Sequence, residues 1–178
     1  MHIVSSMRPK IPALCFAAPG SGYGKTELIE GVTIALSKLK IKVCVLKHSG
    51  HDFEPDKDKD TWRFRRAGAA ASAVITEDGL AAFVVPKSSP EEAINLLDGL
   101  GPDLILCEGF KRSTLPKILI LKDEDEFGVL PSLESAVAVV FDGQAPGWVK
   151  IPVLKKDPKV VAEFVLKYYK KTKEAGEG

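Results

Sequence analysis

The fold is decided by the stretch Ile11-Pro-Ala-Leu-Cys-Phe-Ala-Ala-Pro-Gly-Ser-Gly-Tyr-Gly-Lys-Thr-Glu27. Residues 11–18 are mostly apolar, which predicts a strand buried on both faces. A turn with three glycines follows, and apolar residues at helical spacing then predict a helix over residues 25–39. A buried strand, a glycine-rich turn and a helix in this order form an arrangement in which free backbone N–H groups hold phosphates.

The glycine-rich turn carries the most specific chemistry in the sequence. Glycine lets the backbone fold tightly without Cβ clashes, and the start of the next helix adds partial positive charge. In the pattern GxxxxGK[ST] the lysine reaches the β- and γ-phosphates and the hydroxyl holds Mg²⁺. The first glycine of that pattern falls on Pro19, whereas the Gly-Lys-Thr end is intact. We therefore predict a nucleotide site made of Gly20, Ser21, Gly22, Tyr23, Gly24, Lys25 and Thr26.

The rest of the chain alternates short apolar runs with amphipathic stretches, which is typical of α/β proteins with a largely parallel sheet. Further strands are predicted at residues 41–47, 71–76, 80–86, 103–108, 118–121, 136–141 and 151–154, and further helices at 61–68, 90–100 and from 158 on. Residues 122–126 are interpreted as a solvated turn. We predict a three-layer P-loop NTPase fold, with a mainly parallel central sheet flanked by helices. It forms one nucleotide-binding domain over residues 1–178 with flexible ends at 1–10 and 171–178.

Composition excludes several classes of protein. Lys plus Arg is 25 and Asp plus Glu is 24, a net charge of +1 that argues against a broad nucleic-acid or acidic-membrane surface. No apolar run reaches the roughly 18 residues needed to cross a bilayer, and residues 1–10 lack a hydrophobic stretch long enough for a secretory signal, so we expect none. Cys15, Cys44 and Cys107 lie in apolar runs without CxxC spacing, which indicates buried reduced thiols. We expect a cytoplasmic protein with no nucleic-acid or membrane partner.

An acid at the end of a neighbouring strand is the second requirement of a P-loop site, because it organises Mg²⁺ and water. Glu108 ends the predicted strand 103–108 and is followed by Gly109, which permits close approach. Asp103 opens the same strand and is expected at the opposite edge of the sheet. Glu108 is therefore the candidate, with a surface acid as the alternative interpretation.

A second polar segment, Lys47-His48-Ser49-Gly50-His51-Asp52, follows the predicted strand 41–47. Ligands of open α/β sheets bind at the carboxyl ends of the strands. Lys47 is a candidate for a phosphate contact, and Asp52 for Mg²⁺ or for orienting water. His48 and His51 suggest zinc only weakly, because no cysteine joins them. Polar loop residues or contacts to a substrate anion are the alternatives.

These segments together resemble the MobB family of molybdopterin-guanine dinucleotide biosynthesis adapter proteins. The resemblance also includes Asp56-Lys57, Lys59-Asp-Thr-Trp-Arg63, Arg66-Ala-Gly-Ala69 and Cys107-Glu-Gly-Phe-Lys111, and it runs from about residue 11 to the last helix. The order of the Lys-His and Glu-Gly-Phe-Lys phrases is more specific than the glycine loop alone. The chain departs from the family at residues 56–61, which lack the usual Pro-Gly and are one residue shorter.

The resemblance implies a dimeric GTP-binding protein with weak GTPase activity. It would assist the guanylyltransferase that guanylylates molybdopterin, with GTP and Mg²⁺ as cofactors and molybdopterin as a further partner. The implied catalytic residues are Lys25, Glu108 and Asp52, and the implied metal ligands are Thr26, Glu108 and Asp52. The implied mouth of the site is lined by Lys47, His48, His51 and Asp52. Lys111 and Arg66 are candidates for contacting the pterin-side anion.

The residue that reads the base is left open between two acids. Asp142 follows the predicted strand 136–141, and Asp157 ends Lys155-Lys156-Asp157 after the last strand. The usual guanine-reading motif has Asn or Thr before the Lys, which this segment lacks. Asp157 is alternatively only the cap of the last helix.

Two other classes of function compete with the adapter. An ATP-dependent ligase or kinase resembling dethiobiotin synthetase shares this frame, and ATP preference would favour it. A metal-delivery switch is suggested by His48 and His51. A P-loop without an arginine finger hydrolyses slowly until a partner completes it, and Arg63, Arg65 or Arg66 of a second subunit are candidates for that part.

Overall fold

The computed structural model describes residues 11–49, 54–84, 89–132 and 135–176. Contacts group them into two compact units. The first unit takes the residues up to His48 and those from Ile94 on, and the second runs from Ser49 to Ala93. The helices described are not long and apolar enough to cross a membrane.

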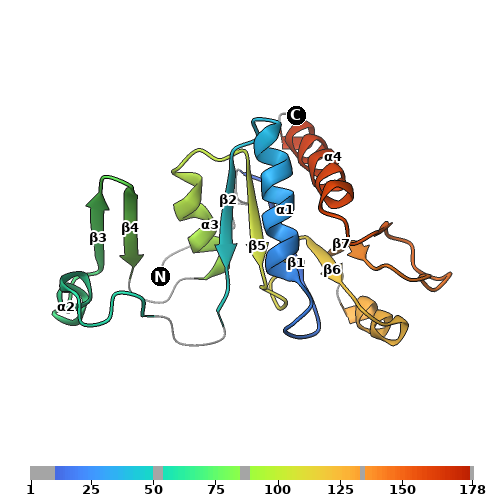
Figure 1. Cartoon of the computed structure of the whole chain (residues 1–178), viewed down its shortest axis with the longest axis horizontal. Coiled ribbons are helices and arrows are strands. Elements are labelled where there is room, and N and C mark those ends of the chain that lie inside the picture. Colours follow the sequence, from blue (N-terminus) through green and yellow to red (C-terminus); the bar gives the residue numbers. More distant parts are fainter. Residues whose placement is uncertain (1–10, 50–53, 85–88, 133–134, 177–178) are drawn as a thin grey trace, which may run out of the picture. The chain divides into compact units, whose positions relative to one another are not determined.

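The first unit is built on a six-stranded sheet in the order β2-β5-β1-β6-β7-β8, with every neighbouring pair parallel (Figure 1). The predicted strands of this unit are confirmed, most of them slightly shorter than predicted. They are β1 (Ala13–Ala17), β2 (Val43–Lys47), β5 (Leu104–Glu108), β6 (Lys117–Ile120), β7 (Ala136–Val140) and β8 (Val153–Leu154). β1 is buried along its whole length, as expected for a central strand covered on both faces.

Helices cover both faces of this sheet. On one face, α1 (Lys25–Lys38) and α4 (Pro158–Gly176) pack against each other and bury Leu14 and Phe16 of β1 (Figure 1). On the other face, Ile94 of α3 (Pro90–Asp98) is buried with Cys15 and with residues of β5. The predicted layers of helix, parallel sheet and helix are confirmed.

The register of the sheet brings the carboxyl ends of three strands to one edge. Lys47 at the end of β2 is opposite Glu108 at the end of β5, and Glu108 is opposite Phe16 of β1. Asp103, just before β5, accepts a hydrogen bond from the backbone of Lys42 at 2.8 Å, at the other edge as predicted. The loop that connects β1 to α1 therefore lies beside Glu108.

The second unit contains α2 (Asp60–Arg66) and an antiparallel hairpin of β3 (Ala71–Thr76) and β4 (Gly79–Val84). The predicted end of α2 is confirmed, because Gly68 has a φ of 108° that favours glycine. The predicted cap by Asp60 or Thr61 is wrong. The helix begins after Lys59 without a side-chain cap, and the Thr61 hydroxyl donates instead to Asp56 at 2.7 Å.

Of three further predictions, a helix cap is confirmed, and a turn and a flexible end differ in the structure. Ser89 and Glu92 form the predicted capping box, with reciprocal hydrogen bonds of 3.1 and 2.8 Å. The solvated turn predicted at residues 122–126 is instead partly a 3-10 helix, η1 (Glu124–Ser132). α4 continues to Gly176 through part of the predicted flexible end, because its last turns are rich in helix-forming Lys, Glu and Ala.

Candidate nucleotide site

The loop between β1 and α1 has the backbone of a phosphate-binding turn. Gly22 and Gly24 have φ values of 75° and 66°, in the left-handed region where a side chain is strained. The Lys25 ammonium folds back and donates to the carbonyl of Gly20 at 2.8 Å. α1 begins at Lys25, so its first free N–H groups and the positive end of its dipole are at this loop.

Glu108 links this loop to the edge strand β2. Its Oε2 accepts a hydrogen bond from the Thr26 hydroxyl at 3.0 Å, and its Oε1 lies 3.1 Å from the Lys47 ammonium. The Glu108 side chain is 13% exposed and that of Lys47 is 59% exposed. The predicted residues Glu108, Thr26 and Lys47 therefore meet. The largely buried Glu108 carboxylate lies between the Lys47 ammonium and the Thr26 hydroxyl.

A tight turn after Glu108 places an aromatic ring against His48. Gly109 has a φ of 95°, and a methyl group built on it would lie 3.3 Å from Cβ of His48. Phe110 also has a positive φ, 54°, which is unusual for a bulky residue and indicates local strain. The rings of Phe110 and His48 have centroids 5.3 Å apart. The His48 N–H donates to the Glu108 carbonyl at 3.0 Å, so this predicted residue does border the site.

A contact not predicted from the sequence fixes Tyr23 of the glycine loop. The Tyr23 hydroxyl donates a short hydrogen bond to Glu126, whose carboxylate also accepts from the Lys122 N–H at 2.7 Å. The Lys122 ammonium lies 4.8 Å from the centre of the Tyr23 ring. The hydrogen bond with Glu126 raises the pKa of Tyr23. Residues 122–126 thus support the glycine loop. In the sequence, this contact is indicated only by their position after a strand of the same sheet.

The two candidate base-reading acids both accept backbone hydrogen bonds. Asp142 Oδ1 accepts from the Lys156 N–H at 2.8 Å. Asp157 Oδ1 accepts from the N–H groups of Lys159 at 2.7 Å and Val160 at 3.4 Å. Asp157 is therefore the N-cap of α4, which confirms the alternative interpretation of this residue. The Lys156 side chain, which the sequence did not single out, extends over Gly24.

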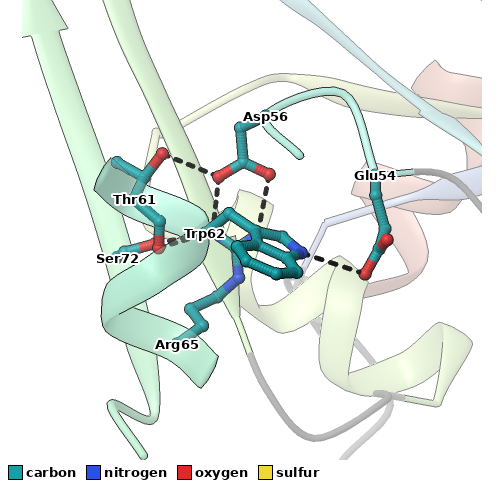
Figure 2. Close-up of polar contacts among 6 residues, drawn as sticks. All are labelled: Glu54, Asp56, Thr61, Trp62, Arg65 and Ser72. Atoms are coloured by element: carbon teal, nitrogen blue, oxygen red, sulfur yellow. Dashed lines mark hydrogen bonds and ion pairs between the residues drawn. The ribbon is translucent and has the colours of Figure 1, made fainter. Parts of the chain in front are cut away.

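In the second unit, Asp56 and Arg65 form a buried ion pair (Figure 2). Two guanidinium nitrogens donate to the two carboxylate oxygens, both at 2.7 Å, and one also donates to Ser72. The hydrogen bond from Arg65 lowers the pKa of Asp56 to about 2. The Arg65 guanidinium also lies 4.5 Å from the Phe83 ring centre. These contacts of Arg65 are all with residues of its own unit.

Several predicted residues remain untested by this geometry. His51 and Asp52 lie outside the described residues. Ser21 and Lys111 are exposed, as is Arg66, whose guanidinium stacks near Trp62 in the second unit. Within the described part of the chain, no group of three His, Cys, Asp or Glu side chains could hold a metal ion.

Comparison with known proteins confirms the resemblance seen in the sequence. A family model described as molybdopterin guanine dinucleotide synthesis protein B (MobB) matches residues 13–142. The molybdopterin-guanine dinucleotide biosynthesis adapter protein of Escherichia coli is 38% identical over 120 residues, 64% of this chain and 67% of that protein. The probable adapter protein of Bacillus subtilis is 30% identical over 152 residues, 83% of this chain and 87% of its own.

Solved structures show the same fold. The crystal structure of Bacillus subtilis MobB superposes with a TM-score of 0.70 at 27% identity, and covers 88% of this chain and 97% of its own. The residues matched by the family model, 13–142, include the glycine loop and the strand that ends at Glu108.

Proposed function

Because the chain belongs to the MobB family, we propose that it acts as an adapter in the biosynthesis of molybdopterin guanine dinucleotide and binds GTP at its glycine loop. The observation that carries the GTP proposal is the meeting of three groups at the carboxyl edge of the sheet. They are the loop with two left-handed glycines, the Lys25 side chain and the Thr26–Glu108 pair. Together they offer N–H donors, a cation and hard oxygens to a phosphate chain.

Mg²⁺ fits the oxygens present. It prefers hard oxygen ligands, and the Thr26 hydroxyl and the Glu108 carboxylate are already 3.0 Å apart. Those two residues would hold the ion, with Asp52 as a further proposed ligand, and the bound ion would neutralise phosphate charge. Lys47 forms an ion pair with Glu108, and its exposed side chain would be free to turn toward a bound phosphate.

We further propose weak GTPase activity in which Lys25 holds the phosphates, Glu108 serves the metal or the attacking water, and Asp52 orients that water. Lys47, His48 and His51 would line the mouth of the site. One of the two acids Asp142 and Asp157 is proposed to read the base, although Asp142 already accepts from the Lys156 N–H and Asp157 already caps α4.

The proposed partners are the guanylyltransferase, molybdopterin and a second copy of the chain. Exposed apolar side chains on the β3–β4 hairpin favour association, since Ile75 is 79% and Leu80 63% exposed. We propose a cytoplasmic location, because the three thiols would stay reduced there. Light scattering of wild type and Ile75→Asp tests the dimer, because the variant should be monomeric if the hairpin forms the interface.

Titration with fluorescent GTP and ATP analogues, with and without Mg²⁺, tests the nucleotide proposal. Lys25→Ala should abolish GTP binding, whereas Lys38→Ala, an exposed lysine in the last turn of the same helix, should leave it unchanged. Preference for ATP, with phosphate release stimulated by a small acceptor, would replace the adapter with a ligase or kinase. Absence of binding to either nucleotide would overturn the proposed site.

A further inference from the structure

Lys156 brings a further ammonium group to the glycine loop, in addition to Lys25. A methyl group built on Gly24 would lie 2.9 Å from the Lys156 Nζ and 3.3 Å from its Cε. The ammonium therefore rests against the backbone of Gly24, one residue before α1 begins. A Glu27 carboxylate oxygen lies 3.7 Å from the same point, so the surroundings of the ammonium are mixed in charge.

The backbone that carries Lys156 is held at three points. The Lys156 N–H donates to Asp142 at 2.8 Å, which joins the loop after β8 to the loop after β7. The next residue, Asp157, caps α4 through the N–H of Lys159. Pro158 then packs directly against Gly31 of α1. The backbone of Lys156 is therefore fixed beside the glycine loop, and only the side chain has to be ordered when a ligand binds.

We propose that Lys156 is a second phosphate-binding lysine of the nucleotide site, and that Asp142 is its positioning residue. The inference rests on the proposed binding of GTP. A phosphate seated on the free N–H groups at the start of α1 lies under the Lys156 ammonium, which then donates a charge-assisted hydrogen bond. Lys25 is the other lysine of the loop, and its ammonium is held at the Gly20 carbonyl.

The competing explanation is that Lys156 only lies against Gly24 on the surface, near Glu27, and contributes little to binding. The two explanations predict different effects of removing the Lys156 ammonium on ligand affinity. A phosphate contact strengthens binding of GTP, GDP and inorganic tripolyphosphate alike, and it makes the affinity more sensitive to salt. With a surface lysine that touches no phosphate, removal of the ammonium changes the free energy of unfolding slightly and leaves the affinities unchanged.

The experiment measures the affinities of GTP, ATP, GDP and tripolyphosphate for purified full-length protein at low and high salt. Lys156→Met should weaken GTP binding about tenfold and flatten its salt dependence, and Lys156→Arg should restore most of the loss. Lys155→Met and Lys159→Met are matched controls, because both are exposed lysines of the same segment, and they should bind like wild type. Melting temperatures confirm that all variants are folded.

Asp142→Ala tests the positioning role. It should cause the same loss as Lys156→Met and add nothing to it in the double variant, with an unchanged ratio of GTP to ATP affinity. A lower ratio of GTP to ATP affinity would overturn the positioning role and make Asp142 the base-reading acid. Equal GTP affinity of Lys156→Met and Lys155→Met would overturn the role of Lys156 alone. If wild type bound no nucleotide or tripolyphosphate, both this inference and the proposed function would fail.

Discussion

Replacing Gly31 by alanine should destabilise the first unit, although alanine is the better helix former. A methyl group on Gly31 would lie 2.6 Å from Cβ and 2.7 Å from Cγ of Pro158. Non-bonded carbons prefer about 3.5–4.0 Å, so α1 and α4 must separate by about 1 Å. Pro158 cannot rotate away, because its ring is part of the backbone.

The magnitude follows from two opposing terms. Overpacking of this kind costs about 1–3 kcal/mol. The higher helix propensity of alanine returns about 1 kcal/mol. We expect a net loss of about 1 kcal/mol in the free energy of unfolding, which corresponds to about 2–4 °C in melting temperature for a chain of this size.

Urea unfolding followed by circular dichroism measures the effect of Gly31→Ala. The matched control is Gly147→Ala, which places the same methyl group in open space and should be neutral or slightly stabilising. Combining Gly31→Ala with Pro158→Gly should remove the penalty. The reasoning is refuted if Gly31→Ala stabilises the protein as much as Gly147→Ala does.

Three other predictions concern single interactions. Asp157→Ala should cost about 1 kcal/mol in urea unfolding by removing the cap of α4, with Asp157→Asn close to wild type. Ser89→Ala should likewise cost about 1 kcal/mol by breaking its capping box, and an unchanged midpoint would contradict the cap. The pKa of Asp56 is lowered from 3.8 to about 2 by Arg65, so its contribution to stability is complete above pH 3.8 and is lost as the pH falls through about 2. Acid titration of Asp56→Asn should lack that loss, and curves with the same shape as wild type would contradict it.

The sheet and its helices could be predicted because their signals are local. A buried central strand needs a continuous apolar run, and residues 13–17 supply one. The glycine loop was predicted because a left-handed backbone and a phosphate contact both favour glycine at Gly22 and Gly24. The meeting of Thr26 with Glu108 followed from the rule that parallel strands end at one edge.

The remaining contacts depend on residues distant in the sequence. Tyr23 and Glu126 are 103 residues apart, and no periodicity or spacing connects them. In the sequence, Lys156 is one of two consecutive lysines before an acid, and the hydrogen bond to Asp142 distinguishes it from Lys155. The cap of α2 was mispredicted because Asp56 competes for the Thr61 hydroxyl.

The reactivity of the three thiols in the central sheet can report how often the sheet opens in the native protein. Cys15 and Cys107 are opposite each other in β1 and β5 and are buried, whereas Cys44 in β2 is half-buried. The hydrogen bond with Cys15 raises the pKa of Cys107, which further suppresses its thiolate. A thiol reagent should therefore label Cys44 in the native state and the other two only when the sheet opens. The rate of the slow labelling then measures how often the core is exposed under native conditions, without any introduced probe.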